Sequence, residues 1–186
     1  MSFRTLVLVI AAAGLILAGC ASYQVDSDFD PEADFAQYDT FTWLPRVADP
    51  DNPVKSDDLL YKRIERAVNN NLAAKGMRLV DSEADASLLV TEHIGIEQKL
   101  RVNTTNYGYG YGRWGYYGGG YQQTQVDQYE QGTLMIDLID AKSKQLVWRG
   151  TAQSRLQNLK TPEERNKRIR EAVNAILERY PPAKKK

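Results

Sequence analysis

The side chains that could perform acid–base or metal chemistry are few. The chain has a single histidine, His93, and a single cysteine, Cys20. A catalytic histidine needs a nucleophile and an orienting group nearby, and no Ser–His–Asp or Cys–His pattern surrounds His93. We interpret His93 as an ordinary strand residue. One histidine also excludes a zinc site with several histidine ligands, and we predict no catalytic residue, no metal and no cofactor.

Three aspartates could form a carboxylate site. Asp137 and Asp140 flank the end of one expected strand, and Asp85 begins another. Paired carboxylates can serve acid–base or metal chemistry, so a carboxylate-dependent hydrolase stays as the least favoured alternative. The structural interpretation is that Asp140 caps a turn through hydrogen bonds to the backbone, and that Asp137 faces water or pairs with a lysine.

The most unusual segment is rich in glycine and tyrosine and reads YGYGYGRWGYYGGGY. It holds seven of the 13 glycines and six of the 11 tyrosines of the chain. No helix follows it, so its glycines do not predict a phosphate-binding loop. Its aromatic rings could stack on sugars, dock a protein or rest at lipid headgroups. The residues expected to make these contacts are Tyr107, Tyr109, Tyr111, Arg113, Trp114, Tyr116, Tyr117 and Tyr121.

The aromatic residues have structural alternatives. The segment from Tyr107 to Tyr121 could be a low-complexity loop without a specific ligand. Trp43 and Trp148 lie in expected strands beside large apolar neighbours, so we predict core positions for both; the functional alternative is the wall of an apolar groove between a sheet and helices. Arg149 alternates to the face opposite Trp148, where it could pair with an acidic residue.

The first residues are typical of a bacterial signal peptide. Arg4 precedes an apolar run from Leu6 to Ala18, which is too short for an ordinary membrane-spanning helix. The sequence Leu-Ala-Gly-Cys that ends at Cys20 resembles a lipobox. The resemblance implies cleavage before Cys20 and acylation of its thiol and amine, and several acyl chains are enough for stable anchoring. The alternative is a plain secretory signal with an incidental cysteine.

The amino-acid composition limits the classes of function that the protein could have. The chain has 186 residues, with 24 basic and 24 acidic side chains. This neutral balance argues against nucleic-acid binding, and 42% hydrophobic residues are enough for a compact core. We predict a signal peptide over 1–19, a lipidated cysteine and short tether over 20–24, one domain over 25–182 with a Gly/Tyr-rich loop at 103–123, and a basic tail over 183–186.

Hydrophobic periodicity predicts six strands and two helices. Alternating apolar residues indicate strands, and apolar residues three and four apart indicate helices. Ser56 is the expected N-cap of the first helix and Gly76 its C-terminal stop, while Thr161, Pro162 and Glu164 form a capping box for the second. The expected strands are 23–28, 38–44, 77–80, 86–100, 125–140 and 146–155, and the expected helices are 56–75 and 161–180.

The order β-β-α-β-β-β-β-α does not alternate regularly, which disfavours a doubly wound parallel sheet. Each helix has one apolar stripe to bury, and each long strand has one richer apolar face. We therefore predict an α+β fold in which a mainly antiparallel sheet carries both helices on one face.

An ordered set of motifs resembles a known family. The set contains the lipobox, the segment from Asp34 to Trp43, the strand from Glu130 to Asp140, Leu-Val-Trp-Arg-Gly from Leu146, and a last helix that ends in Tyr-Pro-Pro at Tyr180. Together these resemble bacterial lipoproteins of the domain-of-unknown-function 4136 family. The resemblance implies a location and a fold and brings no established activity. In outline the fold is also similar to small outer-envelope lipoproteins that assist lipid or lipopolysaccharide transport.

These observations predict a lipid-anchored protein of the bacterial cell envelope. Ala21 after the cysteine favours the outer membrane, facing the periplasm. The leading hypothesis is a non-enzymatic interaction or assembly module that contacts an envelope protein or glycan through the aromatic segment. The alternative is a lipid- or glycolipid-binding accessory that uses an apolar cleft. The membrane is an expected partner through the acyl chains, and Lys184 to Lys186 could touch an anionic surface.

Overall fold

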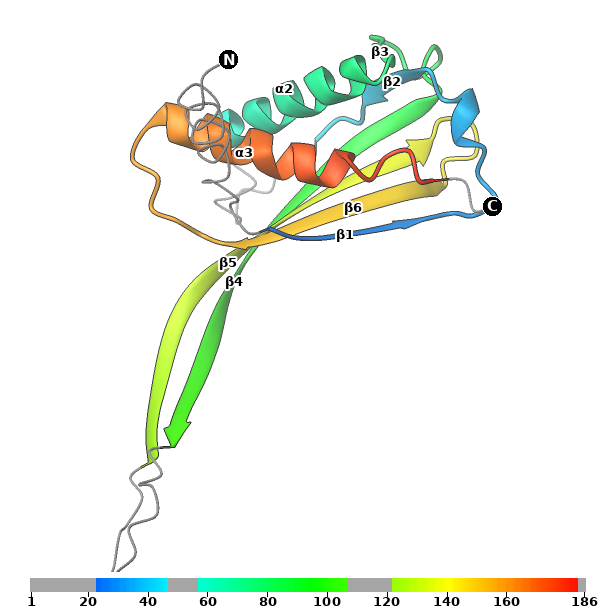
Figure 1. Cartoon of the computed structure of the whole chain (residues 1–186). Coiled ribbons are helices and arrows are strands. Elements are labelled where there is room, and N and C mark those ends of the chain that lie inside the picture. Colours follow the sequence, from blue (N-terminus) through cyan, green and yellow to red (C-terminus); the bar gives the residue numbers. More distant parts are fainter. Residues whose placement is uncertain (1–22, 47–56, 107–121, 184–186) are drawn as a thin grey trace, which may run out of the picture.

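The computed structural model describes residues 23–46, 57–106 and 122–183. Figure 1 shows one sheet, a layer of two helices and a long hairpin that leaves the body of the molecule. The elements confirm the predicted order. They are β1 (Gln24–Phe29), the 3-10 helix η2 (Phe35–Gln37), β2 (Thr40–Trp43), α2 (Asp58–Ala74), β3 (Arg78–Leu79), β4 (Leu88–Asn106), β5 (Gln122–Asp140), β6 (Leu146–Arg155) and α3 (Pro162–Leu177).

The six strands form one mixed sheet in the order β1-β6-β5-β4-β2-β3. The pairs β1–β6, β6–β5 and β5–β4 are antiparallel. The remaining strand β2 is parallel to both of its neighbours, β4 and β3. Both helices lie on one face of this sheet (Figure 1). The predicted α+β class and the mainly antiparallel sheet are therefore confirmed, and the parallel edge is a feature that the sequence analysis did not predict.

The two helices begin and end at recognisable signals. The N-cap of α2 is Asp57, whose side chain accepts a hydrogen bond from the Leu60 amide; the expected cap, Ser56, lies outside the described residues. Gly76 has a φ of 89°, which favours glycine as the C-terminal stop. In α3 the predicted capping box is present, since Thr161 and Glu164 bond reciprocally to each other's backbone amides.

The helices run parallel and side by side. The Arg63 Nε donates to Asn166 Oδ1 at 2.8 Å, and the Asn71 Nδ2 donates to Asn174 Oδ1 at 3.1 Å. The N-terminal ends of α2 and α3 therefore lie at the same end of the molecule, where the hairpin leaves the sheet (Figure 1).

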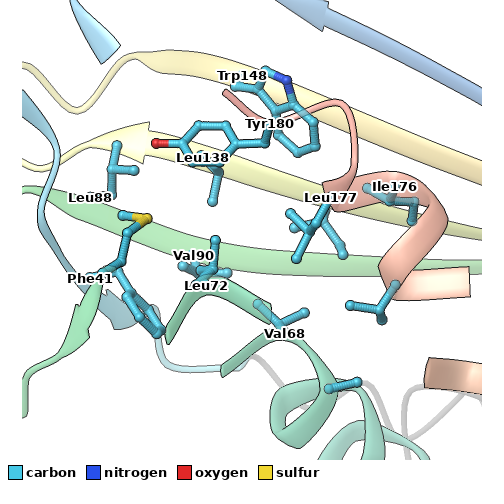
Figure 2. Packing of buried hydrophobic residues seen from close by; sticks show 14 of the residues in the cluster. Phe41, Val68, Leu72, Leu88, Val90, Leu138, Trp148, Ile176, Leu177 and Tyr180 are labelled. Atoms are coloured by element: carbon cyan, nitrogen blue, oxygen red, sulfur yellow. The ribbon is translucent and has the colours of Figure 1, made fainter. Parts of the chain in front are cut away.

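The core lies between the helices and one face of the sheet. Figure 2 shows Phe41, Val90 and Leu138 pointing from the strands toward Leu72 of α2 and Leu177 of α3. Trp148 is fully buried in this cluster, which confirms its predicted core position. Its ring packs edge-on against Tyr180, with centroids 5.4 Å apart.

The two longest strands extend beyond their predicted ends. β4 runs to Asn106 and β5 begins at Gln122, so the loop expected over 103–123 is shorter at both ends. Residues 107–121 connect these two strands and lie outside the described part of the chain.

Candidate functional site

The most distinctive feature is a two-stranded arm, defined here as residues 98–106 of β4 and 122–130 of β5. These residues pair one to one, from Gln98 with Glu130 to Asn106 with Gln122. The neighbouring strands stop earlier, because β2 pairs with β4 only as far as Val90 and β6 pairs with β5 only as far as Gln131. At a rise of about 3.4 Å per residue, the arm is about 30 Å long. Figure 1 shows it standing clear of the body.

The two faces of the arm differ in chemistry. Residues paired directly across an antiparallel ladder share a face, so Leu100, Val102 and Val126 lie on one face. Their exposed fractions are 68%, 61% and 56%. The same alternation puts Val90 and Leu138 on this face inside the body, where the helices cover them. The apolar face of the sheet thus continues into the arm, past the helices that cover it in the body.

The opposite face of the arm is polar. It carries Lys99, Arg101, Asp127 and Tyr129. Lys99 Nζ lies 2.6 Å from Glu97 Oε2, and the Arg155 guanidinium lies over the Tyr129 ring at 5.1 Å. The arm is therefore an amphipathic ribbon.

An apolar groove lies at the base of the arm, between the sheet and the helices. Ile94 and Ile96 of β4, Leu134 of β5, Leu156 after β6 and Ile169 of α3 line it, and its volume is about 180 Å³. The functional alternative for Trp43 and Trp148 was the wall of such a groove, and neither residue lines this one. Trp148 is in the core, and the half-buried Trp43 donates from Nε1 to Asn69 Oδ1 at 2.8 Å.

Arg168 and Tyr23 border the same groove. Arg155 is also at its margin, but its guanidinium lies over Tyr129 on the polar face of the arm. The Arg168 guanidinium lies over the Tyr23 ring at 4.5 Å, and the Tyr23 hydroxyl donates to the Arg168 carbonyl at 2.8 Å. Burial raises the pKa of Tyr23 to about 12. Neither Arg155 nor Arg168 forms an ion pair with a carboxylate of the described ranges.

The side chains that were considered for acid–base or metal chemistry have structural partners. Asp137 is 3% exposed and accepts two hydrogen bonds from Arg149, at 2.7 and 2.6 Å. The expectation that Asp137 faces water or pairs with a lysine is therefore wrong, and the expected acidic partner of Arg149 is confirmed. His93 Nε2 lies 3.7 Å from Asp137 Oδ2 on the open face of the sheet, and the His93 side chain is largely exposed.

Asp140 acts as the predicted turn cap. Its carboxylate accepts hydrogen bonds from the amides of Lys142 and Ser143, and from the Tyr38 hydroxyl. The bond from the Ser143 amide is the largest cause of the lowered pKa of Asp140. Asp137 pairs across the sheet with Thr91 and Asp140 with Leu88, so the two carboxylates lie on opposite faces and do not form a pair.

A separate polar pocket lies where β2 and β4 meet the start of α2. Glu92, Arg46, Asp58 and Glu65 line it. Arg46 pairs with Asp58 and lies over the Tyr61 ring at 4.1 Å. Burial raises the pKa of Glu92 to about 7, which outweighs the opposite effect of the Arg46 charge.

The raised pKa of Glu92 predicts a pH-dependent stability. Because the folded state holds the proton to a higher pH than the unfolded chain does, the free energy of unfolding falls as the pH rises from the unfolded pKa to about 7. We expect a loss of about 1 kcal/mol between about pH 5 and pH 8, since Glu92 is partly open to solvent. Urea denaturation at several pH values measures this slope.

Two substitutions make that measurement specific. Glu92→Gln should remove the slope, since glutamine does not titrate. Glu97→Gln on the opposite face of β4 should keep it, because the lowered pKa of Glu97 leaves that carboxylate ionised throughout this range. An unchanged slope in the Glu92→Gln protein would rule out this carboxylate as the cause.

Other predicted site residues lie outside the described part of the chain. These are Cys20, the aromatic residues from Tyr107 to Tyr121, and Lys184 to Lys186. The structure describes only the residues on either side of the aromatic segment, Asn106 of β4 and Gln122 of β5, which pair at the outer end of the arm. Within the described ranges, no three His, Cys, Asp or Glu side chains cluster closely enough to hold a metal ion. Among the same residues, no helix combines the length and apolar character needed to cross a membrane.

One mixed sheet, one layer of two parallel helices and a protruding ribbon define a small two-layer α+β protein. Residues 25–182 match the family model of the domain of unknown function DUF4136. The chain belongs to this family, as its motifs indicated. A comparison with curated protein sequences finds no match.

Several solved structures are similar to the chain at low sequence identity, and the first of them shares the fold. A PDZ domain protein from Parabacteroides distasonis is 16% identical, with a TM-score of 0.57 over 96% of this chain. This chain spans only 40% of that protein's length. A DUF4136 family protein from Bacteroides thetaiotaomicron is 16% identical, with a TM-score of 0.45 over 86% of this chain and 96% of its own. PelC from Paraburkholderia phytofirmans, a dodecamer, is 14% identical, with a TM-score of 0.44 over 84% of this chain and 95% of its own.

Proposed function

We propose that the protein is a lipid-anchored, non-enzymatic interaction module of the bacterial cell envelope whose contact surface is the arm. The observation that carries the proposal is the apolar face of the arm. Leu100, Val102 and Val126 are more than half exposed there. In the body, the same face of the sheet is covered by helices.

Physical chemistry makes an uncovered ribbon of this kind unfavourable. An isolated two-stranded ribbon is marginally stable in water, and three or more strands or a packed face are needed for independent stability. The arm also presents the unpaired outer edges of β4 and β5, and such edges accept additional strands. A partner that covers the apolar face or adds a strand would therefore stabilise the arm and bury its exposed side chains.

The proposed anchor is Cys20, which lies three residues before Tyr23, the first described residue. The lipobox supports cleavage and acylation at this cysteine, and Ala21 supports the outer membrane, with the protein facing the periplasm. The aromatic residues from Tyr107 to Tyr121 connect β4 to β5 in the sequence, and the proposal includes them as contacts for an envelope protein or glycan.

A second candidate function is a lipid- or glycolipid-binding accessory of envelope transport. The observation that favours it is the apolar groove at the base of the arm, which Ile94, Ile96 and Leu134 line.

Adding charge to the apolar face tests the leading proposal. The double variant Leu100→Glu/Val126→Glu should lose a specific cross-linked partner by about ten-fold or more, because two buried carboxylates without partners are strongly unfavourable in an interface. The measurement is cross-linking in cells, purification and quantitative mass spectrometry at equal protein abundance.

The control is Arg101→Glu, which changes the net charge by the same amount on the opposite face of the arm. It should retain the partner. Equal partner lists for the wild type and the double variant would contradict the proposal that the apolar face is the contact surface.

A further inference from the structure

We propose that a polar pocket on the open face of the sheet, at the base of the arm, binds an acidic oligosaccharide. The open face is the face of the sheet opposite the two helices. The proposal goes beyond the role of the arm in contact with a partner protein, because it assigns a ligand class and binding residues to the other face of the molecule. It depends neither on the anchor nor on the apolar face of the arm.

The pocket lies where the body of the sheet narrows to the arm. The last pair between β6 and β5 is Arg155 with Gln131, whereas β4 and β5 continue together to the end of the arm. Figure 1 shows the sheet narrowing to two strands at this level. Residues of β1, β4, β5 and β6 line a volume of about 480 Å³, which is in the range of small-molecule binding sites.

The polar lining favours a ligand that is rich in hydroxyl groups. Three glutamines, two arginines, an aspartate, a serine and a tyrosine line the pocket, and no aliphatic residue of the described ranges does. Gln131 Nε2 donates to Gln153 Oε1 at 2.8 Å, so the Gln131 oxygen and the Gln153 nitrogen can bond to a ligand. A peptide would bring aliphatic atoms that meet no apolar surface here, whereas saccharide hydroxyls both donate and accept hydrogen bonds.

Two arginines give the pocket its preference for an acidic group. The Arg155 guanidinium lies over the Tyr129 ring at 5.1 Å, and this contact positions the guanidinium and leaves its N–H groups to bind a ligand. Neither Arg101 nor Arg155 forms an ion pair with a carboxylate in the part of the chain that the structure describes. The lining contains one aspartate, Asp127, against these two arginines. Arginine binds carboxylates and phosphates through two parallel hydrogen bonds.

A saccharide with repeated acidic units matches both features of the pocket. Gln131 lies directly opposite Arg155, and Gln153 lies two residues before Arg155 on the same face, so one acidic sugar can meet the guanidinium and both amides. Arg101 lies farther along the arm, opposite Asp127. Asp127 is four residues from Gln131, which is about 14 Å along β5. This distance exceeds one sugar ring, so the two arginines suit two acidic units of an oligosaccharide.

Binding of defined trisaccharides tests the proposal. The protein is the chain from residue 20 onward with Cys20→Ser. The probes are trigalacturonate, its neutral methyl ester and phosphorylated maltotriose, so that the two acidic probes distinguish a carboxylate from a phosphate. We expect the tighter acidic probe to bind at least about ten-fold more tightly than the ester, which cannot form a charged pair with arginine. NMR titration measures the affinity, and the shifted amides should lie in 129–131 and 153–155.

Variants separate the pocket from general surface charge. Arg155→Gln should weaken binding of the tighter acidic probe by about ten-fold, and Arg155→Lys by less, because lysine keeps the charge without the bidentate contact. The control Arg170→Gln removes the same charge from an exposed position on α3 and should leave the affinity unchanged. Circular dichroism confirms that each variant is folded.

Three results would overturn the proposal: acidic probes that bind no more tightly than the neutral ester, equal affinities of the wild type and Arg155→Gln, or shifted amides centred on the helices. The Leu100→Glu/Val126→Glu protein should retain saccharide binding, since both substitutions lie on the other face of the arm. Failure of the arm proposal is therefore read separately, by the loss or retention of the protein partner in that variant.

Discussion

A Gly150→Ala protein is expected to be less stable than the wild type by about 3 kcal/mol or more. An added Cβ at Gly150 would lie 2.3 Å from Cη2 of Trp148 and 2.5 Å from Cγ2 of Ile176. Both neighbours are fully buried, so neither side chain can move into solvent. Overpacking of a rigid core costs about 1–3 kcal/mol and occasionally more, and two such contacts put this site at the upper end. This loss is a large fraction of the stability of a typical domain.

Urea denaturation of Gly150→Ala and Gly95→Ala gives the matched comparison. Gly95 is also a strand glycine, in β4, and its added Cβ meets nothing within 4 Å. The Gly95→Ala protein should stay within about 0.5 kcal/mol of the wild type. Equal stability of the two variants would contradict the close packing of α3 on β6 that the structure shows.

Removal of Cys20 is expected to have the largest effect on location. A protein in which residues 1–19 are replaced by an ordinary cleavable secretory signal, and which carries Cys20→Ser, should move from the membrane fraction to the soluble periplasmic fraction. The membrane-bound share should fall by more than about a hundred-fold, because each buried methylene of an acyl chain contributes about 0.8 kcal/mol to binding. Cell fractionation and incorporation of labelled palmitate measure the two consequences.

The control for this experiment keeps Cys20 and its native leader. That protein should incorporate palmitate and stay in the membrane fraction after a high-salt wash. Membrane retention of the Cys20→Ser protein in the same wash would show that another part of the chain makes the attachment, and the proposed anchor would be wrong.

Local signals predicted much of the fold. The capping box of Thr161 and Glu164 and the stop at Gly76 depend on residues close in the sequence, so the helix ends could be identified directly. The alternation through Leu88, Val90 and Ile94 depends only on the pleat of one strand. The parallel pairing of β2 with β4 depends instead on how α2 crosses the sheet, and no local pattern encodes it.

The binding surfaces were harder to predict. The strands that form the arm continue through Asn103-Thr-Thr-Asn106 and Gln122-Gln-Thr-Gln125. Both segments are polar throughout, so no alternation of apolar and polar residues indicates a strand there. The apolar positions Leu100 and Val102 did offer a signal, since they continue the spacing of Ile94 and Ile96 in β4. Arg168 is brought to the groove only by the packing of α3 on the sheet. Asp137 is buried because the β5–β6 register places it opposite Arg149.

Site-specific photo-cross-linking in living cells tests whether the apolar face of the arm is the contact surface. A photoreactive amino acid is placed in turn at Leu100, Val102 and Val126, and at Lys99 and Arg101 on the opposite face of the arm. We expect one discrete adduct from all three apolar positions and none above background from the two basic positions. Equal adducts from both faces, or no adduct from the apolar face of a correctly anchored protein, would contradict it.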